Sequence, residues 1–170
     1  MSDIKQKYPV TSTVAITAAI ASLASDTNLL AGRASTAVDN TTNQDLDHLV
    51  SGAIVVGTTP TANTSIEVWA YAYQSLATGT PTYPDSITGT DAAKTLTNIG
   101  VKSGILRWVA TLLVPAATSN VVYSFAPVSI ANLFGALPQF YGIFIVHNTG
   151  VALNAAGHSV VYNRIQAQTV

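Results

Sequence analysis

Acidic and histidine side chains gather at one place in the sequence, the segment DNTTNQDLDH at residues 39–48. Asp45, Asp47 and His48 lie among its last residues, and Asp39 begins it. Closely spaced carboxylates can hold a hard cation, and Asp45-x-Asp47 resembles the start of a calcium-binding loop. The glycine and the distal glutamate of such a loop are missing. We therefore expect these side chains to cap a turn and to solvate the start of the next strand, and we predict no metal and no cofactor.

Other combinations of residues that would support catalysis are incomplete. The histidines His48, His147 and His158 are not accompanied by a Gly-x-Ser-x-Gly elbow. Glu67 is the single glutamate, so a glycosidase pair of carboxylates has no supporting motif. The segment KSG at 102–104 lacks the upstream glycines of a phosphate-binding loop. The sequence therefore predicts that the protein is not an enzyme and has no small-molecule substrate.

An aromatic row in the segment SIEVWAYAY, residues 65–73, is the feature best suited to binding. Trp69, Tyr71 and Tyr73 alternate with alanines, so in a strand they share one face. Trp and Tyr combine a large apolar area with a polar group, which suits an interface or a sugar. Three interpretations stay open: the row packs against a second sheet, contacts another subunit, or forms a ligand platform.

Alternation of apolar and polar residues predicts that β-strands carry these side chains. In 65–73, the small and branched residues should face the core, while Glu67 indicates that the aromatic face is the wetter one. In 104–114, Trp108 should share a side with Leu112, and Pro115 should end the strand. The core-facing residues of 65–73 are expected to be Ile66, Val68, Ala70 and Ala72.

Further strands and one helix are predicted along the chain. Residues 119–125 should pair with 104–114 across the turn between them. Residues 129–137 have helical spacing with Ser129 as N-cap, and 78–98 is the longest expected irregular loop. The segment 11–20 has enough alanine for a helix, but the Val, Ile and Thr at its start favour a strand. The remaining predicted strands are 48–57, 140–148 and 159–168.

About eight strands with one short helix predict an all-β fold, a β-sandwich or jelly roll. We expect one domain at 13–170, preceded by an N-terminal arm at 1–12. Tyr8 and Pro9 suit an extended arm that lies over an adjacent subunit. Arg107 is surrounded by apolar residues, and it either reaches solvent from a strand edge or pairs with a carboxylate of a neighbouring chain. The candidate interface residues are Tyr8, Pro9, Trp69, Tyr71, Tyr73 and Arg107.

The composition favours a protein that works inside an assembly. Charged residues make up 9% of the 170 residues, whereas soluble proteins average roughly 25%. Such a surface associates readily, which indicates that other subunits cover much of it. Lysines and arginines are scattered, so we predict no nucleic-acid partner. The apolar stretch 14–24 is interrupted by Thr17 and Ser22, and we expect no signal peptide. The apolar run 128–146 is interrupted by Pro138, Gln139 and Gly142, and we expect no membrane span.

Four segments of the chain together resemble small structural proteins of tailed-bacteriophage virions, of the capsid cement or decoration type. They are GRASTAVDNTTNQDLDHLV (32–50), SIEVWAYAY (65–73), LPQFYGIFIVHNTGVAL (137–153) and VVYNRIQAQTV (160–170). The resemblance implies a β-sandwich that forms an oligomer, most often a trimer, and binds the major capsid protein. The chain would be made in the host cytoplasm and reside in the virion, preferably on the capsid surface, with the tail as the other place. The resemblance brings no catalytic residues.

Two other functions stay open from the sequence. The first is a structural protein of the phage tail, such as an adaptor or baseplate component. The second is a carbohydrate-binding module that would use the aromatic row Trp69, Tyr71 and Tyr73 as its platform.

Overall fold

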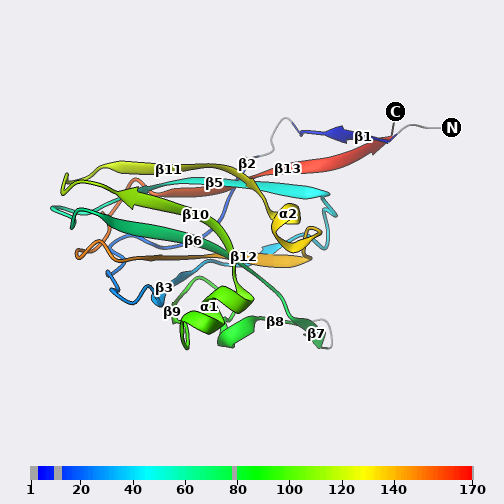
Figure 1. Cartoon of the computed structure of the whole chain (residues 1–170). Coiled ribbons are helices and arrows are strands. Elements are labelled where there is room, and N and C mark those ends of the chain that lie inside the picture. The colour runs from blue at the N-terminus through cyan, green and yellow to red at the C-terminus, as the bar shows by residue number, and fades with distance from the viewer. Residues whose placement is uncertain (1–3, 10–12, 78–79, 170) are drawn as a thin grey trace.

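Two antiparallel β-sheets pack face to face, as Figure 1 shows. The computed structural model describes residues 4–9, 13–77 and 80–169. The predicted all-β sandwich with a short helix is confirmed. Short strands that the sequence pattern does not reveal add to the long predicted ones, because strands of two to four residues are too brief to display a period.

The first sheet has the order β1-β13-β5-β11, and β2 also pairs with β13. The second sheet has the order β10-β6-β12-β3-β9, and β4 also pairs with β12. The strands of the first sheet are β1 (Ile4–Lys7), β2 (Thr13–Ala15), β5 (Asp47–Val55), β11 (Val122–Ser129) and β13 (Ser159–Thr169). Those of the second are β3 (Ala31–Ala34), β4 (Val38–Asp39), β6 (Thr64–Ala72), β9 (Ala92–Thr95), β10 (Arg107–Val114) and β12 (Phe140–His147). A separate ribbon joins β7 (Ser75–Ala77) to β8 (Thr80–Thr82).

The main core lies between the two sheets. Ile66, Val68 and Ala70 of β6 are buried in it as predicted, and Ala72 packs against its margin. Facing side chains come from both sheets, which is the arrangement that a sandwich requires. They include Val50, Ile54, Leu112, Val114, Phe125, Ile143, Ile145, Val160 and Tyr162.

A β-bulge in β10 reverses one prediction. Trp108 lies opposite Trp69, but the next regular pair joins Ala110 to Val68, so Val109 is the extra residue. The bulge shifts the alternation of sides. As a result Trp108 is 56% exposed, whereas Leu112 is buried in the core. The prediction that these two side chains share a side is therefore wrong.

Strand β11 pairs with β5 in the first sheet and not with β10, which corrects the predicted hairpin. The connection between Val114 and Val122 crosses from one sheet to the other. Its Pro, Ala, Thr, Ser and Asn residues suit a turn of either kind, so the local sequence does not distinguish a hairpin from a crossing.

Residues 83–106, here called the cover segment, contain β9, which is the edge strand of the second sheet. Their other parts, the 3-10 turn η1 (Pro84–Ser86) and helix α1 (Ile99–Ile105), pack on the outer face of that sheet. Ile87, Leu96 and Leu106 of the cover segment form a second apolar cluster with side chains of the sheet. The expected loop 78–98 is therefore partly regular, and residues 104 and 105 end a helix and do not begin a strand.

The two helices are short and each has a polar N-cap. Asn98 accepts a hydrogen bond from Val101 N at 2.9 Å in α1. Ser129 accepts one from Asn132 N at 3.0 Å in α2 (Ile130–Phe134), as predicted. The latter helix stops before the predicted end because Gly135 adopts a left-handed conformation, φ 84°.

In the predicted strand 11–20, only Thr13–Ala15 is a strand, and residues 11 and 12 lie outside the described part. Ile16 and Ile20 are nevertheless buried, and Ile16 N donates to Val160 O at 2.8 Å. The described part of the predicted arm, residues 4–9, contains β1, which pairs with the end of β13.

Gly142 lies opposite Tyr71 on the outer face of the second sheet. A Cβ atom at position 142 would stand 2.3 Å from the Tyr71 ring. Because Gly142 has no side chain, the Tyr71 ring can lie over β12 at this position.

Candidate functional site

The structure brings the aromatic row onto one face of β6 but covers that face. Tyr71 is fully buried, and its hydroxyl donates to Ser35 O at 2.7 Å. Tyr73 is half-buried, with its ring edge-on to Phe140 at 6.0 Å between centroids. The prediction that this is the wetter face is wrong for Tyr71, because the cover segment lies over it. The row therefore offers no continuous exposed platform.

Glu67 was expected to indicate a solvent-exposed strand face, but it pairs with Lys102 of α1 instead. The lysine is 1% exposed, and its Nζ donates to Glu67 Oε2 at 2.5 Å and to Leu29 O at 2.7 Å. Trp69 donates to the same carboxylate oxygen at 2.9 Å, and Lys102 Nζ stands 5.1 Å from the Trp69 ring centre. The partly buried glutamate therefore serves as an anchor for the cover segment.

The other candidate interface residues lie at the surface. Tyr8 is 62% exposed and Pro9 is half-buried. Arg107 is exposed at the start of β10, 5.9 Å from the Phe134 ring centre. Among the described residues Arg107 makes no ion pair, and its Nη1 donates to Leu106 O at 3.3 Å. This geometry fits the interpretation that it reaches solvent, and pairing with a neighbouring chain stays a prediction.

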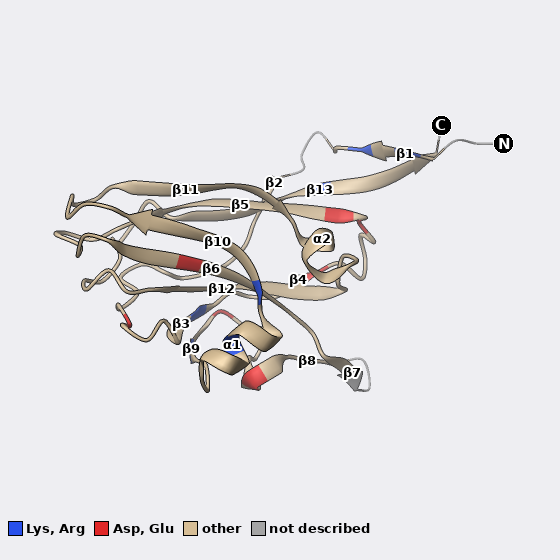
Figure 2. Ribbon diagram, viewed as in Figure 1, with Lys and Arg blue, Asp and Glu red and all other residues tan. Residues whose placement is uncertain are grey.

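An exposed apolar patch on β10 was missed by sequence reasoning. It consists of Trp108, Thr111 and Leu113, and we call it the β10 patch. Trp108 is 56% and Leu113 is 70% exposed, and Trp108 Nε1 donates to Thr111 Oγ1 at 3.0 Å. Strand β10 is the edge of the second sheet. Figure 2 shows that charged residues are sparse over the ribbon and that β10 has one only at its start.

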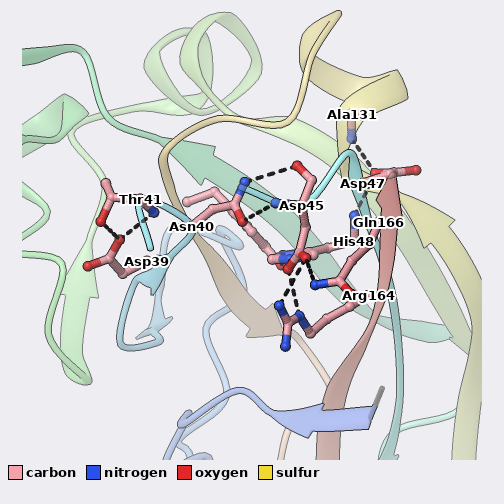
Figure 3. Close-up of polar contacts among 10 residues, drawn as sticks. Asp39, Asn40, Thr41, Asp45, Asp47, His48, Ala131, Arg164 and Gln166 are labelled. Atoms are coloured by element: carbon pink, nitrogen blue, oxygen red, sulfur yellow. Dashed lines mark hydrogen bonds and ion pairs between the residues drawn. The ribbon is translucent and has the colours of Figure 1, made fainter. Parts of the chain in front are cut away.

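A buried polar cluster centred on Asp45 lies where the loop before β5 meets β13 (Figure 3). Arg164 donates to both carboxylate oxygens, at 2.7 and 3.0 Å. Gln166 Nε2 donates to Asp45 Oδ1 at 2.8 Å. His48 Nε2 lies 2.8 Å from Asp45 Oδ2, and His48 Nδ1 lies 2.9 Å from the Tyr141 hydroxyl. The cluster thus ties the loop before β5 to β5 itself, β12 and β13.

The loop that carries Asp45 is also fixed through its backbone. Asn40 accepts from Asp45 N at 2.8 Å and donates to Asp45 O at 3.1 Å. Asp47 accepts from its neighbour His48 N at 2.7 Å and from Ala131 N in α2 at 2.8 Å. Asp47 therefore contributes to capping the distant helix α2, and the expected capping of a local turn comes from Asp39, which accepts from Thr41 N at 2.8 Å. The expectation that the group solvates the strand is wrong for Asp45 and His48, which are 6% and 1% exposed.

Electrostatics fix the protonation states in this cluster. Burial alone would raise the pKa of Asp45, but hydrogen bonds from Arg164, His48 and Gln166 outweigh it and hold the pKa below its ordinary value. Burial lowers the pKa of His48 although Asp45 opposes this. Burial raises the pKa of Tyr141. The cluster therefore combines a carboxylate, a neutral imidazole and a protonated phenol at neutral pH.

The order tyrosine, histidine, aspartate suits a proton relay, but here all three side chains are enclosed. Catalysis requires the reacting group to be within hydrogen-bond reach of a substrate. Tyr141 is 0% exposed and its hydroxyl faces His48. The Asp45 cluster can therefore hold elements together, and its geometry gives no access to a substrate.

Two buried neutral histidines make the stability sensitive to acid. His147 is 0% exposed, lies between Thr149 and Leu23 O, and has a pKa lowered by burial, as does His48. In the unfolded chain both have pKa values near 6.5. Because the unfolded state binds more protons, their contribution is complete above that value and is lost as pH falls through it, by up to about 1.4 kcal/mol per pH unit for each histidine.

We expect the free energy of unfolding in urea to fall between about pH 7.5 and about pH 5.5, and to change little between about pH 7.5 and about pH 8.5. The variant His147→Gln should show a shallower fall, whatever its stability at neutral pH. Identical slopes for both proteins would contradict this assignment.

In the described part of the chain, no three His, Cys, Asp or Glu side chains are arranged to hold a metal ion. The described helices are also too short or too polar to cross a membrane. Comparison with known proteins found no matching family model, no similar curated protein and no similar solved structure.

Proposed function

We propose that the chain is a structural protein of a phage virion, and specifically a cement or decoration protein that binds and stabilises the head shell as an oligomer. The observation that carries the proposal is the β10 patch, an apolar surface on the edge of a charge-poor sandwich. The resemblance of four segments to virion structural proteins supports the choice of particle.

Edge strands in monomeric proteins usually carry lysine, proline or inward charges that prevent association. Strand β10 has none of these from Trp108 to Val114. Tryptophan is among the residues that contribute most to protein interfaces. Covering a side chain of the size of Leu or Trp is worth about 1.5–3 kcal/mol when burial is complete. The β10 patch can therefore supply much of the energy of docking on a shell.

Shells with and without the protein should rupture at different temperatures, the decorated ones higher, because a ligand that binds the intact state stabilises it. Equal rupture temperatures would exclude a cement role. Counting copies per particle distinguishes a shell site, with many copies, from a tail site, with few.

The variant Trp108→Ala/Leu113→Ala should bind shells at least about 30-fold more weakly, which corresponds to the roughly 2 kcal/mol of an interface hot spot. Leu46→Ala is the matched control, because Leu46 is also exposed, at 47%, but lies before β5. Equal weakening by both variants would show that the β10 patch has no special role.

A further inference from the structure

The ends of the described chain form a two-stranded ribbon, which we call the terminal ribbon: β1 with residues 166–169 of β13. Ile4 lies opposite Thr169, and Lys7 lies opposite Gln166. The pairing of β13 with β5 ends at Ile165, so the ribbon extends beyond β5. Figure 1 shows it projecting from the body of the sandwich.

Among the described residues, no buried apolar side chain supports the terminal ribbon. All four side chains of β1 are exposed, and Ile4 is 75% exposed. Residues 167–169 are exposed as well. A two-stranded ribbon without a hydrophobic face is marginally stable in water. Among the described strands β1 pairs with β13 alone, so the backbone hydrogen bonds of this pairing are what hold it.

We propose that β1 exchanges between copies of this chain, so that β1 of one copy pairs with residues 166–169 of a second copy. The exchanged pairing forms the same backbone bonds and covers no core residue, so it has the same contacts as the pairing within one chain. Exchange of identical elements is a low-cost route to oligomers. The equilibrium between pairing within one chain and pairing between two copies then depends on the local concentration of copies.

The neighbouring strand β2 stays with its own chain. Thr13 Oγ1 donates to Asn163 Oδ1 at 2.5 Å, and Ile16, directly after β2, is buried in the main core. Exchange would therefore involve β1 and leave β2 paired within its own chain.

The charges of β1 favour pairing with the uncharged end of β13 over pairing with another β1. Lys5 and Lys7 make no ion pair among the described residues, and they face the neutral amides of Gln168 and Gln166. Lysines on an edge discourage pairing with other strands, and two β1 strands would repel each other. The uncharged tail QAQT of a second copy, residues 166–169, offers the complement that β1 already has in its own chain.

This proposal rests on the proposed function and deepens it by naming the segment that links copies. Its test uses no shell, so strand exchange and the cement function can each be excluded independently of the other. The chain has no cysteine, so engineered thiols report without background. Gln6 and Ala167 are directly opposite in the ribbon, which brings Cβ atoms within the range of a disulfide.

Chains carrying only Gln6→Cys should be mixed with size-tagged chains carrying only Ala167→Cys, at about 10 µM to about 1 mM, and oxidised. We expect mixed disulfide dimers in excess of random collision, with a share that rises with concentration. The matched control mixes Thr13→Cys with Asn163→Cys, an opposed pair of β2 and β13, which should give no such excess. If the ribbon pair yields no more mixed dimer than the control at every concentration, strand exchange is excluded.

Discussion

Replacing Asp45 by alanine is expected to lower the free energy of unfolding by about 3 kcal/mol, because it leaves Arg164, Gln166 and His48 without their common acceptor. The removal of one partner from a buried ion pair costs about 3–5 kcal/mol, and the lower end applies because the Arg164 side chain is 20% exposed. Asp45→Asn should lose less, since its amide oxygen still accepts a hydrogen bond.

Urea unfolding at neutral pH measures this effect, and Asp39→Ala is the matched control. Asp39 is exposed and accepts hydrogen bonds from Thr41 N and Oγ1 at 2.8 and 2.6 Å. Its loss should cost about 1 kcal/mol or less. Equal losses for the two aspartates would mean that the Asp45 cluster adds nothing to stability.

Replacing Lys102 by methionine should lower the free energy of unfolding by about 2–3 kcal/mol. Methionine keeps the volume of the side chain but leaves the Glu67 carboxylate, 18% exposed, without a cation. The double variant Lys102→Met/Glu67→Gln should recover a large part of the loss, since the amide that replaces the carboxylate is uncharged and its oxygen still accepts from Trp69 Nε1. Urea unfolding of the single and double variants measures both effects.

Lys94→Met provides the comparison for the second prediction. Lys94 pairs with Asp85 at 3.5 Å in the same cover segment, but both side chains are more exposed than Lys102, at 19% and 11%. Its loss should cost about 1 kcal/mol or less. A double variant that is no more stable than Lys102→Met alone would contradict the assignment of Glu67 as the anchor of Lys102.

The long strands were predictable because their signal is local. Residues 48–57, 65–73, 140–148 and 159–168 contain alternating or continuous apolar runs bounded by turn residues, and each matches a strand within about two residues. The N-cap of α2 was predictable for the same reason, since Ser129 and the backbone it caps are adjacent.

The errors concern contacts between distant segments. Glu67 and Lys102 are 35 residues apart, and no local pattern shows that one neutralises the other. Asp45 meets Arg164 across 119 residues, so its burial could not be expected from the acidic segment alone. The bulge at Trp108 likewise depends on pairing with β6, and it exposes a residue that regular alternation would bury.

The candidate surfaces also differ in whether local sequence or distant contacts determine them. Tyr8 is 62% exposed, and an arm that lies over a neighbouring subunit stays a prediction. The aromatic row was found by its spacing, but whether a strand face is open depends on what packs over it. The β10 patch was missed because the exposure of Trp108 follows from the bulge opposite β6, and the edge position of β10 follows from the order of the sheet.

The place of the Tyr71 ring over Gly142 has a consequence for evolution. Any side chain at position 142 would collide with the ring, so these positions can only drift together: a larger residue at 142 demands a smaller one at 71. In lineages that keep the tyrosine, the glycine should persist even where the surrounding sequence has changed beyond recognition. We therefore expect substitutions at positions 71 and 142 to be coupled.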